Sequence, residues 1–193
     1  MADTITGLTP LPPRLSPVAG LFAETLSDAP AGLTIAARVM DQVQIDCRPD
    51  RIESIALPLP APGRAVSVDG LRLLSLAPGR WMALSAGSTD LMALLRECCG
   101  AAVLVDQSHG RTSLRLSGPR ARDVLASGTG IDLHPRAFAE DRVASTALFH
   151  VPVTLDRRLG TATFDLHMAR GYAHSLAERL IAAGRQYGVA VVL

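Results

Sequence analysis

The chain has 193 residues, of which 48% are hydrophobic and 19% are charged, and its formal net charge is +1. This length suits one domain, or two small halves that share a core. The nearly balanced charge provides no broad positive field, which argues against nucleic acid as a partner.

The first 30 residues are rich in Pro, Gly, Ser and Thr. They lack the basic and apolar regions of a secretory signal, and the apolar runs elsewhere are far shorter than the roughly 20 residues that span a bilayer. We therefore expect a cytoplasmic protein with no membrane partner. Residues 1–30 are predicted to be an extension, and residues 31–193 a single domain. The scattered apolar residues of the extension are expected to bury on a partner: Leu11, Leu15, Val18, Leu21, Phe22 and Leu26.

Regular hydrophobic patterns follow the extension. Residues 43–48 alternate between apolar and polar, the period of a half-buried strand, and residues 49–57 have helical spacing. Next come the two strands of a hairpin, a helix and a strand, at 71–76, 80–85, 88–99 and 101–105. Ser88 or Thr89 is expected to cap this helix, and Gly100 to end it. Its buried stripe is predicted to contain Leu91, Leu94, Leu95 and Cys98.

The second part of the chain repeats this order of elements. The predicted strands lie at 112–117, 143–155, 161–168 and 188–193, and the predicted helices at 117–127 and 171–187. Ser117 and Pro119 are expected to start the shorter helix. The inward positions of the two helices are predicted to be Ala121, Val124, Leu125, Ala173, Leu176, Ala177 and Leu180.

Two matching series of elements indicate an internal duplication. We predict an α+β fold of duplicated ferredoxin-like βαββαβ halves, which intertwine and cover about residues 42–108 and 109–193.

Asp106, Ser108 and His109 are the three residue types of a nucleophilic triad, but they lie in one tight turn. A triad needs a base within about 3 Å of the nucleophile and a third group behind the base, and neighbouring residues of a turn seldom converge in that way. We expect Asp106 and Ser108 to bond the backbone of their own turn, with Gly110 supplying a left-handed conformation. The sequence therefore predicts a structural turn.

The other polar candidates do not form a site on sequence grounds. The cysteines lack the spacing of a metal site and are expected to be inert thiols: Cys47, Cys98 and Cys99. Trp81 is expected to anchor the core. The histidines have no ligand-like spacing, and the carboxylates are expected to be solvated: His134, His150, His167, His174, Asp90, Asp123, Glu140 and Asp141. We therefore expect no catalytic, cofactor-binding or metal-binding residues in this chain.

Three segments carry a family resemblance: 76–84, 105–138 and 164–184. The Asp-x-Ser-His-Gly-Arg turn from Asp106, followed by a strand and Gly-Pro, resembles the folate-binding fold of the glycine cleavage T protein. The three segments together resemble the gamma subunit of heterotetrameric sarcosine oxidase more closely than the T protein. The resemblance implies two halves that exchange their first strands. It assigns no catalytic role to Asp106 or Ser108.

The resemblance also implies a function. The expected complex oxidatively demethylates sarcosine to glycine, producing hydrogen peroxide and passing a one-carbon unit to tetrahydrofolate. Its alpha, beta and delta subunits would be the partners of this chain, and they would hold FAD, FMN, NAD and zinc. Two alternatives remain: the equivalent subunit of another N-methyl amino acid dehydrogenase, such as one acting on N-methylglutamate, and a stand-alone module that binds folate or a flavin.

Overall fold

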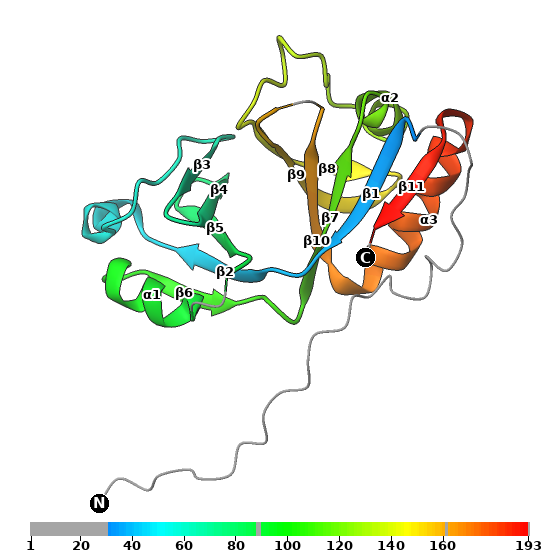
Figure 1. Ribbon diagram of the computed structural model, residues 1–193. Coiled ribbons are helices and arrows are strands. Elements are labelled where there is room, and N and C mark those ends of the chain that lie inside the picture. Colours follow the sequence, from blue (N-terminus) through cyan, green and yellow to red (C-terminus); the bar gives the residue numbers. More distant parts are fainter. Residues whose placement is uncertain (1–30, 88–89, 161, 193) are drawn as a thin grey trace, which may run out of the picture.

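The structure is a computed structural model that describes residues 31–87, 90–160 and 162–192. The predicted extension and the predicted capping residues Ser88 and Thr89 lie outside the described residues. Two β-sheets lie side by side, and the chain crosses between them from β1 to β2 and from β6 to β7 (Figure 1).

The first sheet has five strands in the order β3-β4-β5-β2-β6. Their bounds are Asp41–Asp46 for β2, Ala65–Val68 for β3, Leu71–Ala77 for β4, Arg80–Ser85 for β5 and Val103–Asp106 for β6. The second sheet has six strands in the order β11-β1-β7-β10-β9-β8. Their bounds are Leu33–Arg38 for β1, Arg111–Ser117 for β7, Val143–Leu148 for β8, Val151–Arg157 for β9, Phe164–Ala169 for β10 and Val189–Val192 for β11.

The topology confirms the predicted duplication. The first half contributes β2, β4, β5 and β6. When these strands are numbered one to four along the chain, their order across the sheet is two, three, one, four. The strands β7, β9, β10 and β11 of the second half have the same order, except that β1 lies between β7 and β11. Both series are split βαβ arrangements of the ferredoxin-like kind.

The implied exchange of first strands is present, but the exchanged strands are the ones just before those that the sequence predicted as first. β1 lies in the second sheet, antiparallel to β7, and β6, which leads into the second half, lies in the first sheet, antiparallel to β2. β2 and β7 stay in the sheets of their own halves, and β11 extends the second sheet parallel to β1. The sequence prediction missed β1, whose partners β7 and β11 lie far away in the chain, and β3, a strand of four residues that pairs with β4.

The helices differ from prediction mainly at their ends. Residues 49–57 form only the short 3₁₀ helix η1 (Pro49–Ser54). The cap of α1 (Leu91–Cys98) is Asp90, whose side chain accepts from the Ala93 amide at 3.0 Å. Arg120 precedes α2 (Ala121–Ala126) without a side-chain capping bond, so the predicted start at Ser117 is wrong.

At the C-terminal end of the chain, η2 (Arg170–Tyr172), α3 (Ala173–Gly184) and η3 (Arg185–Tyr187) follow one another. The predicted inward residues of α2 and α3 are all buried. Among the described helices, none combines the length and the apolarity needed to cross a membrane.

A tight turn divides the predicted strand 143–155 into β8 and β9. Phe149 and His150 form this turn with φ angles of 48° and 67°, the geometry that a two-residue hairpin favours. The Phe149 ring packs on Gly128, where an added Cβ would lie 2.7 Å from ring carbons. This contact of the Phe149 ring offsets the strain of the positive φ angles, which the turn adopts without a glycine.

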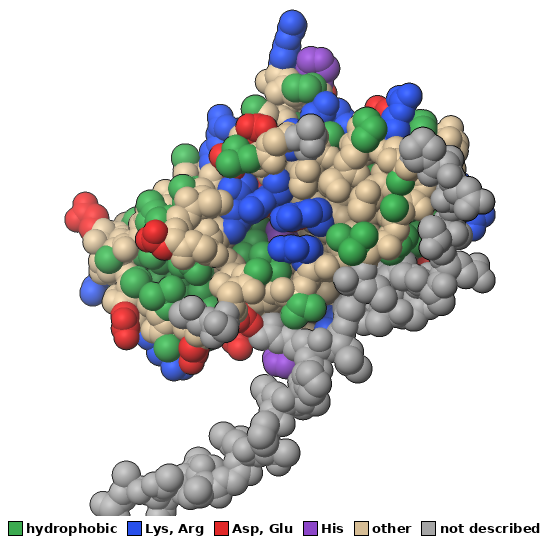
Figure 2. Space-filling view, in the orientation of Figure 1, with side chains coloured by type: hydrophobic (Ala, Val, Ile, Leu, Met, Phe, Trp, Pro, Cys, Tyr) green, Lys and Arg blue, Asp and Glu red, His purple; other side chains and the backbone are tan. Residues whose placement is uncertain are grey.

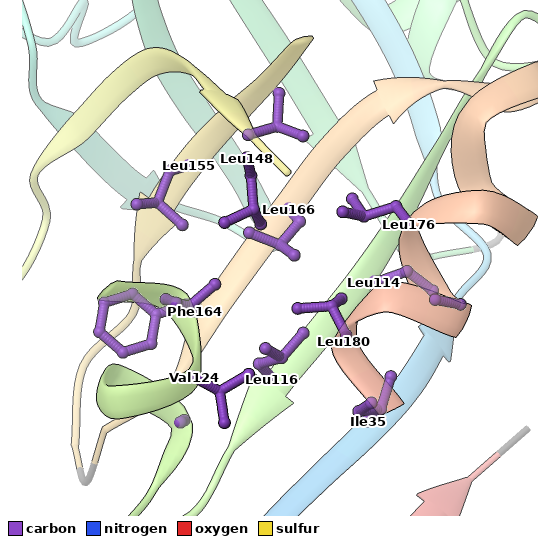
Figure 3. Packing of buried hydrophobic residues seen from close by; sticks show 14 of the residues in the cluster. Ile35, Leu114, Leu116, Val124, Leu148, Leu155, Phe164, Leu166, Leu176 and Leu180 are labelled. Atoms are coloured by element: carbon purple, nitrogen blue, oxygen red, sulfur yellow. The ribbon is translucent and has the colours of Figure 1, made fainter. Parts of the chain in front are cut away.

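Each sheet packs one face against helices. Leu176 and Leu180 of α3 pack against the six-stranded sheet at Leu114, Leu116 and Leu166 (Figure 3). A second cluster joins α1 to the five-stranded sheet. A smaller third cluster packs the five-stranded sheet against Val143 of β8. The other face of the six-stranded sheet is therefore free to carry polar residues.

Candidate functional site between the two sheets

The face of the six-stranded sheet that points away from α2 and α3 is charged and polar. Residues directly opposite one another on neighbouring strands share a face, and the register sets Asp165 of β10 between Arg115 and Asp156. The same register sets His167 between Ser113 and Thr154. Most of these side chains are buried, so each needs a hydrogen-bond partner.

Arg72 connects the two sheets. It lies on β4, and its side chain is 5% exposed. Its Nε and Nη2 donate to the two carboxylate oxygens of Asp156 on β9, at 3.1 and 2.6 Å. Its Nη1 donates to Asp141 at 2.6 Å and to Ser67 at 3.1 Å. Arg72 is therefore a latch between the halves, and Asp141 is not the simply solvated carboxylate that the sequence predicted.

Electrostatics favour this latch. Burial by itself would lower the pKa of Arg72, but the Asp156 and Asp141 carboxylates outweigh burial and raise the pKa above its ordinary value. Bidentate pairing of a guanidinium with a carboxylate is the strongest form of such a contact. The pairing therefore favours the charged form of the Arg72 guanidinium.

A second ion pair lies beside the latch. Arg115 donates from Nε and Nη2 to the two oxygens of Asp165, at 2.7 and 2.8 Å. Arg158 approaches Asp165 at 3.6 Å and Asp156 at 3.5 Å. Burial would raise the pKa of Asp165, but the hydrogen bonds from Arg115 lower it below its usual range. Both buried carboxylates, Asp156 and Asp165, are thus paired with arginines of this chain.

A neutral polar chain continues from the ion pairs into the interior. Gln42 Nε2 donates to Ser113 Oγ at 3.2 Å, and Ser113 Oγ lies 2.8 Å from His167 Nδ1. His167 Nε2 is buried and has no hydrogen-bond partner among the described residues, so the imidazole is held at Nδ1 only. Burial lowers the pKa of His167, although Asp156 and Asp165 oppose the shift. The imidazole is therefore neutral near pH 7, sealed from solvent and not available as a base to an external substrate.

An open groove of about 310 Å³ runs along the charged face. We call it the central groove. Its lining includes the apolar Met40 and Leu84 and four arginines: Arg38, Arg72, Arg115 and Arg158. Figure 2 shows the basic side chains gathered in the middle of the molecule, and all are arginines because the sequence contains no lysine. The Nε of Arg38 has no hydrogen-bond partner among the described residues. Such a groove suits an anionic ligand or an acidic segment.

Asp106 bonds the backbone of its own turn, as predicted, whereas Ser108 bonds a neighbouring strand. Asp106 Oδ1 accepts from the Ser108 amide at 2.8 Å. Ser108 Oγ, however, accepts from the Gln42 backbone amide at 2.9 Å and so ties the turn to β2. His109 is exposed, and Gly110 is absent from the residues with positive φ, so the predicted left-handed Gly110 is wrong.

The remaining candidates are dispersed. Cys47 and Cys99 are buried, and burial raises the pKa of the Cys99 thiol to about 11, so it is a poor nucleophile. In the part of the chain that the structure describes, no three His, Cys, Asp or Glu side chains form a metal-binding group. Trp81 lies in the core, as predicted, at 6% exposure. His174 lies 3.6 Å from Glu178 on the exposed face of α3.

Sequence reasoning missed the buried ion pairs. One signal was present: Arg72, Arg115 and Asp165 each stand between two apolar residues of a strand, and Asp156 follows Leu155 in β9. Opposite charges at such positions suggest strands that neutralise one another. The alternation alone was consistent with an ordinary solvated face.

Comparison with solved structures defines the class of the fold. The chain superposes on the glycine cleavage system aminomethyltransferase T from Bartonella henselae with a TM-score of 0.65 and 23% identity, over 84% of this chain and 48% of that chain. The duplicated halves therefore have the T-protein type of fold. Residues 63–192 match the family model of the GCVT N-terminal domain, and the chain belongs to this family.

Individual proteins share more of their sequence with this chain. The sarcosine oxidase subunit gamma of Corynebacterium sp. (strain P-1) is 36% identical over 123 residues, which are 59% of this chain and 61% of that protein. The subunit gamma of strain U-96 is 29% identical over 133 residues, 64% of this chain and 65% of that protein. The alignments thus span less than two thirds of these curated relatives. The heterotetrameric sarcosine oxidase from Corynebacterium sp. U-96, in complex with pyrrole 2-carboxylate, gives a TM-score of 0.80 at 26% identity, over 90% of this chain and 96% of that chain.

Proposed function

We propose that this chain is the gamma subunit of a heterotetrameric sarcosine oxidase. The whole enzyme would oxidise sarcosine to glycine, reduce oxygen to hydrogen peroxide and pass the one-carbon unit to tetrahydrofolate. The observation that carries the proposal is the superposition on a chain of a heterotetrameric sarcosine oxidase over 96% of that chain, with a TM-score of 0.80. The 36% identity with a curated gamma subunit supports it independently.

The role of this chain in the proposed complex is assembly. Its strongest polar contacts are directed inward: Arg72 to Asp156, and Arg115 to Asp165. The first contact fixes the two sheets relative to each other, and the second joins β7 to β10 within the six-stranded sheet. Together they give partner subunits one rigid surface to bind. The proposal assigns the flavins, NAD and zinc to the alpha, beta and delta subunits, and no reaction step to residues of this chain.

The proposal is tested by purifying the chain, with an affinity tag on its chromosomal copy, from cells grown on sarcosine. We expect three further polypeptides to co-purify in fixed proportion, and the complex to form hydrogen peroxide from sarcosine. An N-methylglutamate arm in the same assay distinguishes the related dehydrogenase. Recovery of the chain alone, or a complex that turns over only N-methylglutamate, contradicts the proposal.

A second function, a stand-alone folate- or flavin-binding module, is favoured by one observation, the arginine-lined central groove. Titration of the isolated chain with tetrahydrofolate and with FMN separates the two functions. The assembly role requires no tight binding of either compound. Saturable binding that weakens about tenfold in R158Q would support the module instead.

A further inference from the structure

A second group of arginines lies on the opposite side of β9 from the central groove. Successive side chains of a strand point to opposite faces, so Asp156 faces Arg72 while Arg157 faces the side covered by α2 and α3. There Arg157 is directly opposite Phe164 of β10 in the register. Its guanidinium carbon lies 5.0 Å from the centre of the Phe164 ring. Arg157 is thus a cation at the end of an otherwise apolar core face.

Arg157 is held by neutral groups only. Its Nη1 donates to the carbonyls of Arg158 and Thr163 at 2.5 and 3.0 Å, and its Nη2 to the carbonyl of Gly160 at 2.9 Å. Among the described residues it forms no ion pair with a carboxylate. Arg157 is 6% exposed, so its charge is poorly hydrated. Without a paired carboxylate, this charge is also not neutralised locally.

A second guanidinium stands next to it. Arg122 of α2 lies 6.0 Å from the centre of the same Phe164 ring. Its Nε is buried and has no hydrogen-bond partner among the described residues. Burial lowers the pKa of Arg157, and the charge of Arg122 lowers it further, while Glu140 acts in the opposite direction. Two like charges therefore share one poorly hydrated site with a single acidic neighbour.

These arginines line an open pocket of about 570 Å³, here called the Arg122 pocket. Its other walls are mostly apolar. Glu140 also lines the pocket, and one of its carboxylate oxygens is already bonded to the Gly160 amide at 2.9 Å. The apolar contributors are Pro135, Phe138, Ala139 and Ala162. The volume falls within the roughly 300–1,000 Å³ typical of small-molecule sites, which combine apolar walls with a few polar anchors.

We propose that the Arg122 pocket binds a small organic acid, with its carboxylate on Arg122 and its apolar body against Phe138 and Ala139. A carboxylate matches the forked donors of a guanidinium, would provide the buried Nε of Arg122 with an acceptor, and would relieve the repulsion between the two arginines. The apolar walls favour an acid with an aromatic or branched body over a bare anion. This site is separate from the central groove and does not depend on the proposed oxidase function.

The full-length chain is titrated with benzoate and, separately, with benzamide, which is a neutral analogue of benzoate with the same shape. Binding is monitored by the chemical shifts of the backbone amides. We expect saturable shifts for residues 138–140 and for Arg122 with benzoate only. R122Q should weaken benzoate binding about tenfold or more, because a charge-assisted bond is lost. R122K, which keeps the charge without the fork, should lie between R122Q and the unaltered chain.

The matched control is R136Q, which removes an exposed arginine from the loop that contributes Pro135 and Phe138 to the pocket. This variant should leave the affinity for benzoate nearly unchanged. Arg157 is left in place because it holds the carbonyls of the neighbouring loop. Unshifted resonances elsewhere in R122Q establish that the fold is intact. Equal binding of benzoate and benzamide, or equal weakening by R122Q and R136Q, would overturn the proposal.

Discussion

The latch between the two halves provides the sharpest test of the structure. Replacing Arg72 with methionine (R72M) keeps much of the apolar stem but removes the guanidinium. Asp156, whose side chain is 0% exposed, then remains buried with only the 3.5 Å contact from Arg158. Breaking a buried pair by removing one partner costs about 3–5 kcal/mol, because an uncompensated charge remains inside the protein. We expect R72M to lose stability in this range.

Asp141 offers a matched control on the same arginine. Its side chain is 36% exposed, so D141N should cost about 1 kcal/mol or less. Asparagine also tolerates the φ of 60° at this position. The double variant R72M/D156L removes both charges and should regain much of the loss, which measures the coupling of the pair directly.

Urea unfolding is the appropriate assay, followed by far-UV circular dichroism and by the fluorescence of Trp81, the single tryptophan. Trp81 reports on the five-stranded sheet, whereas circular dichroism reports on both sheets. In R72M we expect both transitions to move to lower urea. The reasoning is refuted if R72M costs no more than D141N, or if the losses in the double variant simply add.

Three further predictions address other parts of the molecule. Burial depresses the pKa of His167 below its ordinary value of 6.5, so the unfolded chain takes up the proton first as the pH falls. Stability should therefore be complete above pH 6.5 and decline below it, by up to about 1.4 kcal/mol per pH unit, and H167Q should abolish this decline in unfolding curves measured across pH. S108A should cost about 1–2 kcal/mol, because the buried Gln42 amide loses its acceptor, while the exposed H109A should stay within about 0.5 kcal/mol; loss of turnover in a stable, assembled S108A complex would contradict the structural role. Deletion of residues 1–30 should reduce recovery of partner subunits in a pull-down while the domain still folds, and equal recovery from both chains would rule out a docking role.

Local patterns in the sequence determined most of the individual elements. The hairpin β4–β5 follows from two apolar runs around Ala77-Pro78-Gly79, and α3 follows from the spacing of its apolar residues. These features depend on neighbours within a few residues, where periodicity and turn chemistry act. The same order of elements occurs in both halves, and this was sufficient to predict the duplicated α+β fold.

The tertiary structure alone decided how the halves connect and what the charged residues do. β1 forms only because β7 and β11, both distant in the chain, offer it an edge on each side. Arg72 and Asp156 are 84 positions apart, and each stands in a strand whose alternation fits a solvated face equally well. Burial of that face by the opposite sheet turns these residues into a latch, because a charge removed from water must find its counter-charge within the protein. Such pairing depends on which faces meet, and a local sequence pattern carries no information about that.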